Sequence, residues 1–412
     1  METPLVALSR GQLAHLCREF MLAAQFNSRC GYAALRINHG DEAYKDVAID
    51  NWMAASPVYT RRMQRAMSFV GDSVETIFKG LQLECGMPHQ YMDARFALDT
   101  PYQGRFWLDS CGPLLETEPR GEDAVRVMCH DIEDPTFDAT AVATNPRARM
   151  RPVHRPPRVP AERAPHCEWR VFVDDEAEPL VEREITREMA ATGLAQVALP
   201  RTEDREPGGL ADYSGELFEQ MQLERFSHAA LVQVCGELGV QVHLLSTALM
   251  SAVALRYGDE AALAVGEFQM EGSCWVLSNR LADWLGCAGG GLDAIEHVLA
   301  LHPAFHPRQY FDIQVNREEG ALLLALADCP AVSEASPYGW QALLRQRRLA
   351  GLQALVRGVD TRAGVEPLPG RLAWRVTLDA SPATEEPFSV QVAKSTVLYQ
   401  ARIEDHIQLL QL

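Results

Sequence analysis

The sequence predicts an α+β protein that is a tandem duplication of one domain, with helices and a short antiparallel sheet in each copy. The chain has 412 residues, which is longer than a domain with one hydrophobic core usually is, so two domains are expected. Similar segments recur in the same order in its two halves. Within each half, apolar residues at helical spacing give way to period-two alternation, which indicates helices followed by strands. We expect a pseudo-two-fold axis between the copies.

The recurring segments lie about 218 residues apart. "LSRGQLAHLCREF" (8–20) matches "FSHAALVQVCGEL" (226–238), where Ser9 and Ser227 differ by 227 − 9 = 218 positions. "HCEWRVFVD" (166–174) matches "RLAWRVTLD" (371–379) at a shorter offset of 205, or 371 − 166. The repeat predicts this division of the chain: a first α+β repeat at 1–178, an acidic linker at 179–222, a second, degenerate repeat at 223–380, and a C-terminal tail with a strand-like start at 381–412.

The elements of the first copy follow from caps and periodicity. Ser9 can accept hydrogen bonds from the free amides of a first helical turn, as can Ser227 in the second copy. The acids of "GDEA" suit a helix N-terminus, and Pro57 suits the first position of a further helix. The pattern then predicts a helix at 73–85, a hairpin at 91–111, a helix at 121–133 that stops at Pro135, and a strand at 167–174.

Composition and charge restrict the class of protein. The formal charge is −18, so the surface does not suit nucleic acid or an anionic membrane. The N-terminal segment lacks the pattern of a signal peptide, and no run of about 18 apolar residues is present. The ten cysteines form no CxxC pair, which favours reduced thiols and a cytoplasmic location.

The stretch "MCHDIEDP" (128–135) concentrates reactive side chains in the first copy. Its counterpart "LVRGVDTR" (355–362) keeps only the acidic position, and His166 and Cys167 are likewise replaced by Arg371 and Leu372. The second copy therefore folds without these polar groups. We expect them to be functional, and the predicted catalytic residues are Cys129, His130, Glu133 and His166.

The stretch 128–135 allows three interpretations. His130 and Glu133 lie three positions apart on one helix face and, with His166, could bind iron or zinc. Alternatively, Cys129 could be a nucleophilic thiolate paired with His166. The third reading is a polar helix end without chemistry. No nucleotide or flavin motif occurs, so the cofactor stays unknown.

The segment 145–166 contains six prolines and six arginines, which indicates an extended loop. As a lid, it would use Arg151 or Arg155 to orient an anionic substrate. As a structural loop, it would lie across the acidic surface. Trp107 and Cys111, on the preceding strand, complete the predicted substrate-binding residues.

The order "FWLDSCG…VRVMCHDIE…HCEWRV" resembles the domains of L-2-amino-thiazoline-4-carboxylate hydrolases and of the vinyl-reductase type. This resemblance implies that helices and a short antiparallel sheet enclose a ligand and that sheet cysteines contribute to its site. It covers about 70 residues and transfers no catalytic residue. The whole chain also resembles bacterial proteins of uncharacterised function, which we associate with lipid or steroid catabolism.

The sequence therefore predicts a cytoplasmic enzyme of small-molecule catabolism, a metal- or cysteine-dependent hydrolase or lyase that acts on a partly apolar anion. The alternative is a non-catalytic ligand-binding or accessory protein. The expected partner is a small molecule, without nucleic acid or membrane, and a homodimer or an accessory role to another enzyme fits either function.

Overall fold

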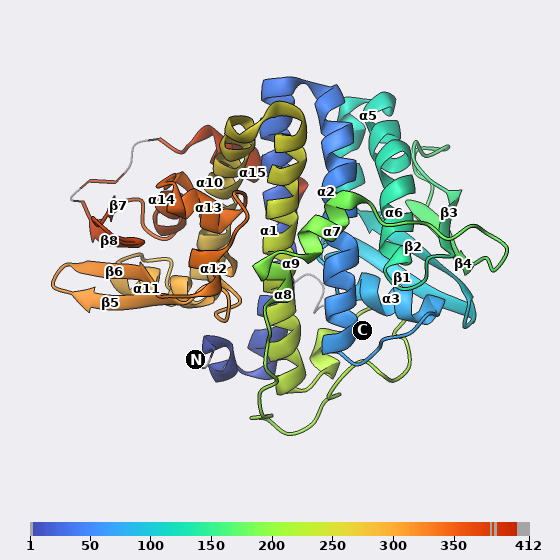
Figure 1. Cartoon of the computed structure of the whole chain (residues 1–412), viewed down its shortest axis with the longest axis horizontal. Coiled ribbons are helices and arrows are strands. Elements are labelled where there is room, and N and C mark those ends of the chain that lie inside the picture. The colour runs from blue at the N-terminus through green and yellow to red at the C-terminus, as the bar shows by residue number, and fades with distance from the viewer. Residues whose placement is uncertain (1–2, 380, 383–384, 402–412) are drawn as a thin grey trace.

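The computed structural model describes residues 3–379, 381–382 and 385–401, and it shows an α+β fold. Two four-stranded antiparallel sheets lie on opposite sides of a group of long helices (Figure 1). The sheet of the first half has the strand order β1-β2-β4-β3, and that of the second half has the corresponding order β5-β6-β8-β7. The predicted fold class is thus confirmed.

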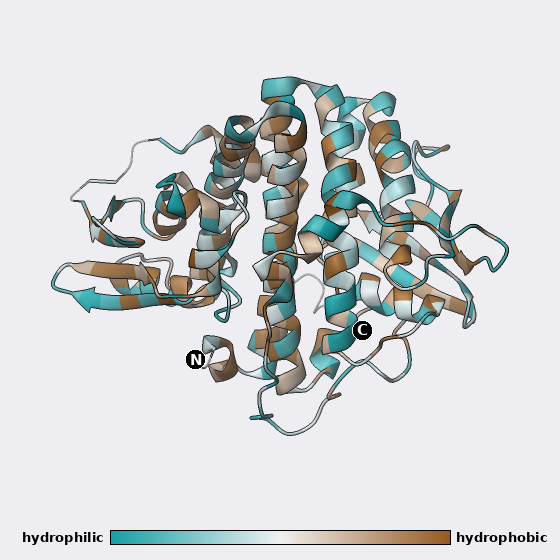
Figure 2. Ribbon diagram, viewed as in Figure 1, coloured by the Kyte–Doolittle hydropathy of each residue, from teal (hydrophilic) through white to brown (hydrophobic). Residues whose placement is uncertain are grey.

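Four long helices form the centre of the molecule. Helices α1 (Arg10–His39) and α9 (His228–Tyr257) have 30 residues each, and α2 (Asp41–Ala66) and α10 (Asp259–Trp284) have 26 each. Helix α1 packs on α9 and α10, and α9 also packs on α2. Apolar residues run along these helices, whereas the outer loops are more polar (Figure 2). The two halves therefore share one hydrophobic core.

The predicted caps are present. Ser9 Oγ accepts from Gln12 N and Gln12 Oε1 accepts from Ser9 N, which forms a capping box at α1. Ser227 Oγ accepts from Ala230 N at the start of α9. Among the described residues, α9 alone is long and apolar enough to cross a membrane, but 83% of its apolar window is buried inside the protein. A helix buried to this extent is a core helix of the protein.

The remaining elements of the first half surround its sheet. They are η1 (Pro4–Ala7), α3 (Val74–Gln82), β1 (Met92–Thr100), β2 (Gln103–Cys111), α4 (Gly112–Thr117), η2 (Glu118–Arg120), α5 (Glu122–Arg126), the π-helical η3 (Val127–Ile132), α6 (Glu133–Val142), β3 (Ala148–His154) and β4 (Cys167–Val173). The indole of Trp169 on β4 stacks on Phe106 of β2 and meets Phe137 of α6 at a ring distance of 4.7 Å. These rings fix α6 on the sheet.

The second half has a similar series with shorter strands. It contains η4 (Leu223–Arg225), α11 (Leu292–Leu301), η5 (Pro303–Phe305), β5 (Ile313–Glu318), β6 (Ala321–Leu326), α12 (Pro330–Ser333), α13 (Trp340–Arg345), α14 (Ala350–Arg357), β7 (Ala363–Pro367) and β8 (Ala373–Leu378). His302 separates the end of α11 from Pro303, the first residue of η5.

Several local predictions were wrong. Pro57 lies inside α2 and starts no new helix. Pro135 does not end a helix, because the π-helical η3 continues directly into α6 and the proline lies in the first turn of α6. The segment 145–166 is not only a loop, since β3 lies within it and pairs with β4. Each half therefore has four strands, one more than expected.

The linker and the tail also differ from the expectation. The linker 179–222 contains α7 (Glu184–Ala190) and α8 (Gly193–Gln196), which pack on α2 and α9. The start of the tail forms α15 (Phe388–Lys394) and α16 (Val397–Gln400) rather than a strand, and α15 packs on α10. The part of the tail at 402–412 lies outside the described residues.

Two buried ion pairs join the halves reciprocally. Arg62 of the first half donates from Nε and Nη2 to the carboxylate of Glu237, at 2.8 and 3.0 Å. Arg280 of the second half donates from the same two atoms to Glu19, at 2.8 and 2.7 Å. Both arginines and both glutamates are separated by 218 positions (280 − 62 and 237 − 19).

Further contacts repeat this reciprocity. Arg10 Nε donates to Phe226 O at 3.1 Å, and the corresponding His228 Nε2 lies 3.1 Å from Leu8 O. Contacts in which each half gives and receives the same bond are typical of a two-fold interface. These correspondences agree with the repeat in the sequence, whereas the origin of the halves by duplication stays a prediction.

We expect Arg62→Ala to lower the free energy of unfolding by about 3–5 kcal/mol, because it leaves the buried carboxylate of Glu237 without its counter-ion. Burial raises the pKa of Glu237, and Arg62 acts against that shift. Chemical denaturation measures the effect. Arg187→Ala is the matched control, since the side chain of Arg187 is 56% exposed and its pair with Glu184 lies on the surface; it should cost about 0.5 kcal/mol or less. Equal losses for both variants would contradict the role of the buried pair.

Candidate functional site

The first half encloses a cavity of about 110 Å³ between its long helices and the chain that leads to α6. Helices α1 and α2 form one side, and residues of 84–92, η3 and α6 form the other. Most of the wall is apolar and aromatic, with Trp52, Met87 and Phe137 among the lining residues. Three ionisable side chains that interrupt this wall are Arg29, Glu84 and Glu133.

Arg29 places a guanidinium at the cavity. Its Nε lies 3.2 Å from Glu116 Oε2, and its guanidinium carbon lies 6.0 Å from the ring of Tyr91. Within the described residues, Nη1 and Nη2 of Arg29 have no hydrogen-bond partner. Burial acts to lower the pKa of Arg29, but its neighbours, Tyr91 first and Glu116 next, raise that pKa above its ordinary value. Arg29 therefore places a positively charged guanidinium at the cavity, and its Nη atoms can donate hydrogen bonds to a ligand.

Glu84 follows α3 and contributes a buried carboxyl group. Its side chain is 5% exposed, and Oε2 lacks a hydrogen-bond partner among the described residues. Burial raises the pKa of Glu84 to about 8, because an unpaired carboxylate is costly in a poorly solvated site. Glu84 is therefore mostly protonated at neutral pH.

Glu133 lies where the π-helical η3 changes into α6. π-Helical turns interrupt the regular helical spacing and are frequent at functional sites. Burial raises the pKa of Glu133 to about 8, while the nearby Arg155 acts in the opposite direction. Its side chain keeps some accessible surface and lines the cavity. Two carboxyl groups with pKa values near 8 can exchange protons with a ligand near neutral pH.

The second half does not repeat the charges of Arg29 and Glu84. At an offset of 218, Arg29 corresponds to Thr247 (29 + 218) and Glu84 to His302 (84 + 218). His302 is buried, and its Nδ1 accepts from Ala304 N at 3.1 Å. Burial lowers its pKa to about 3, so it is neutral. The combination of one arginine and two raised carboxyl groups thus distinguishes the first half.

The predicted thiols form a buried group beside the cavity. Cys111 ends β2, Cys129 lies in η3 and Cys167 begins β4, and all three are buried. Burial raises the pKa of each thiol, and the carboxyl of Glu133 adds to the shift. The thiolate is the reactive form. Their environment therefore does not fit a nucleophile, and they pack as small apolar side chains.

The predicted metal ligands do not converge. His130 Nε2 lies 2.7 Å from Pro156 O, and His166 Nδ1 accepts from Cys111 N at 3.1 Å, so both imidazoles already bond to the main chain. Glu133 lies at the cavity instead. Across residues 3–379, 381–382 and 385–401, no group of three His, Cys, Asp or Glu side chains has a geometry suited to a metal ion. The prediction that His130, Glu133 and His166 bind iron or zinc is therefore wrong.

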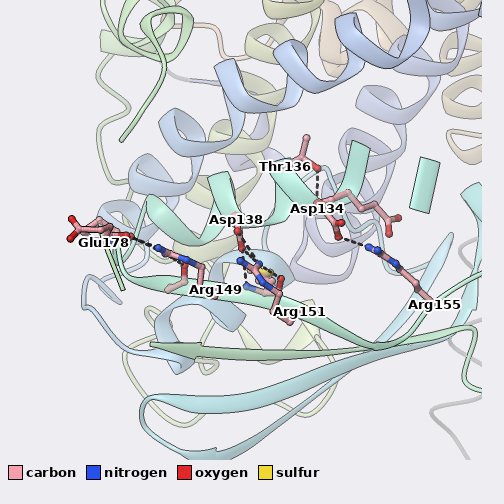
Figure 3. A network of polar contacts seen from close by, with 11 residues as sticks. Asp134, Thr136, Asp138, Arg149, Arg151, Arg155 and Glu178 are labelled. Carbon is pink, nitrogen blue, oxygen red and sulfur yellow. Dashed lines mark hydrogen bonds and ion pairs between the residues drawn. The ribbon is translucent and has the colours of Figure 1, made fainter. Parts of the chain in front are cut away.

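The predicted substrate-binding arginines pair with α6 rather than line the cavity. Arg151 Nη1 lies 2.9 Å from both carboxylate oxygens of Asp138, and Arg155 pairs with Asp134 (Figure 3). Trp107 lies on the face of β2 opposite to the buried Phe106. The arginines of this segment therefore pair with acidic side chains of their own domain.

Among the predicted catalytic residues, only Glu133 lines the cavity. The sequence reasoning missed Arg29 and Glu84, which lie between the segments that define the repeat. A signal was present, because both positions change their chemistry between the halves. Neither residue lies in a recognisable catalytic or metal-binding motif, whereas 128–168 concentrates reactive side chains.

Comparisons with known proteins give no relative. No protein-family model matches the chain, and no curated protein or solved structure shows significant similarity to it. The functional argument therefore depends on the geometry of the cavity.

We expect the native protein to react slowly with a thiol reagent at pH 7. Nine of the ten cysteines are buried, and Cys287 is the one partly accessible thiol. Titration with an aromatic disulfide reagent should therefore detect about one thiol in the native state and all ten after unfolding. Cys287→Ser should abolish the native signal. Fast reaction of Cys129 in that variant would contradict its assignment as a packing residue.

We expect Glu84→Gln to remove a pH-dependent loss of stability. An unfolded glutamate loses its proton near its ordinary pKa of 4.5, whereas folded Glu84 retains it up to about 8. Between these values the native state binds more protons, so this group lowers the free energy of unfolding as pH rises. Relative to the wild type, the variant should gain stability from pH 5 to pH 8 in urea unfolding. The exposed Glu203→Gln serves as control, and an equal trend in both variants would contradict the shift.

Proposed function

We propose that the cavity of the first half binds a small, partly apolar anion and that Glu84 and Glu133 transfer protons to and from it. The observation that carries this proposal is the meeting of Arg29 with two carboxyl groups of raised pKa in one mostly apolar cavity. Pockets of this composition bind small molecules through a few well-placed polar groups.

The residues suggest a division of roles. The free Nη atoms of Arg29 would bind a carboxylate or another anionic group, because they are charged donors in a poorly solvated site. The apolar wall at Trp52 and Phe137 would contact the rest of the ligand. A cavity of about 110 Å³ is somewhat smaller than the engineered cavity of about 150 Å³ that accepts benzene. A ligand of about four to seven non-hydrogen atoms would therefore fit.

Acid–base chemistry follows from the carboxyl groups. Near pH 8, each is about half protonated, so one can accept a proton while the other donates one. Such a pair would support proton abstraction next to a carbonyl and protonation of the resulting oxygen. Chemistry of this kind needs neither the buried thiols nor the histidines. The alternative is a protein that binds the same anion without turnover, and the experiments below separate the two.

We expect Arg29→Met to weaken the binding of 2-oxobutyrate at least about tenfold, since a charge-assisted pair contributes on the order of 1.5–3 kcal/mol. Methionine keeps the length of the side chain and removes its charge. Calorimetric titration measures the dissociation constant. Arg187→Met, on the exposed surface, is the matched control and should bind as the wild type does. Equal affinity of both variants would contradict the anion site.

The catalytic part is tested by exchange of the C3 protons of 2-oxobutyrate in deuterated solvent, followed by proton magnetic resonance. The wild type should accelerate exchange, with a maximum near pH 8. The double variant Glu84→Gln, Glu133→Gln should bind the probe and lose the acceleration. Binding without acceleration by the wild type would overturn the catalytic role and favour the non-catalytic alternative.

A further inference from the structure

A second cavity, of about 360 Å³, lies between the linker and the second half. Its wall includes Met189 and Thr192 around the turn from α7 to α8, Thr247 of α9, and the loop after α12 with Glu334 and Tyr338. None of these residues belongs to the first cavity. The second cavity is therefore separate from the first.

Glu334 corresponds to Glu116 of the first half, at 334 − 116 = 218. Each carboxylate accepts from the main chain of a short helix that crosses between the halves. Leu398 N of α16 donates to Glu116 Oε1 at 3.0 Å, and Leu194 N of α8 donates to Glu334 Oε2 at 2.9 Å. These helices begin in the same way, since Thr396 and Thr192 both cap them. The two carboxylates thus occupy equivalent places.

Their counter-ions differ. Glu116 pairs with Arg29, and the position of Arg29 is Thr247 in the second half. Glu334 accepts from Leu194 N, Ser336 N and Tyr310 Oη, but it has no cationic side-chain partner within the described residues. Arg345 donates to the main-chain oxygens of Glu334 and Ser336. A buried carboxylate without a cation is costly, and it favours a ligand that supplies one.

Thr247 provides an independent observation. Its side chain is 2% exposed and lines the cavity, and Oγ1 has no hydrogen-bond partner among the described residues. A buried hydroxyl group without a partner is unfavourable and can accept from a ligand. In the first half, an arginine side chain starts at this position and extends to the carboxylate. In the second half, Thr247 and Glu334 line the second cavity instead.

We propose that this second cavity binds an organic cation, a guanidinium or primary ammonium group on a short apolar chain, in the place of the missing arginine side chain. The cationic head pairs with Glu334 and donates to Thr247. The chain contacts Ile185 and Met189, and the exposed Glu188 adds a second negative charge at the cavity. The site is independent of the anion cavity in the first half.

The test uses N-propylguanidinium, which reproduces the arginine side chain, and its uncharged analogue N-propylurea. Calorimetric titration of the full chain at low millimolar concentrations should detect saturable binding of N-propylguanidinium at one site. N-propylurea should bind at least about tenfold more weakly, because it lacks the charge. Thr247→Arg supplies the missing side chain and should abolish binding, whereas the matched Thr361→Arg, at an exposed position, should retain it.

Glu334→Gln should weaken binding about tenfold or more, since it removes the counter-ion. If this variant does not fold, Thr247→Arg and N-propylurea still decide the question. Absence of saturable binding by the wild type would overturn the proposal, as would equal binding of the charged and uncharged probes. Unchanged affinity in Thr247→Arg would show that the probe binds elsewhere and would also overturn it.

Discussion

The two buried pairs, Arg62–Glu237 and Arg280–Glu19, are the constraint on which the arrangement of the halves depends. Each guanidinium meets its carboxylate through two donors, and its third nitrogen donates to a crossing segment, at Ala195 O or Ala401 O. A buried ion pair is stabilising only when such additional bonds satisfy the charges. The pairs therefore couple three parts of the chain, and loss of one arginine would release a helix contact and a crossing segment together.

This coupling explains how the two cavities can differ on one scaffold. The helices and crossing segments are held by contacts that occur in both halves, so side chains beside those contacts are free to change. Arg29 and Thr247 occupy equivalent places next to equivalent carboxylates, yet one supplies a fixed cation and the other leaves space. The difference in charge beside Glu116 and Glu334 thus arises from the change between Arg29 and Thr247 within a common frame rather than from a difference in fold.

The sequence predicted what depends on local chemistry. Ser9 and Ser227 cap their helices because the hydroxyl group acts on neighbouring amides, and the strands around Trp107 and Trp169 follow from alternation. The prediction failed where contacts with distant parts of the chain determine the secondary structure. The prolines of the 145–166 segment suggested a loop, but edge position and pairing with β4 make part of it a strand. The pattern of the tail suggested a strand, yet packing on α10 favours a helix there.

The candidate site was also only partly predictable from the sequence. The internal repeat marked Cys129 and His130 as surplus to the fold, whereas Glu133 was included for its spacing from His130, although the second half keeps an acid, Asp360, at its position. Burial determines which of these groups is usable: it suppresses ionisation of a thiol but brings a carboxyl group close to neutral pH. The same desolvation that removes the cysteines from consideration makes Glu84 and Glu133 candidates for proton transfer. Reactivity in this chain is therefore a property of the cavity around a residue and cannot be assigned from residue type.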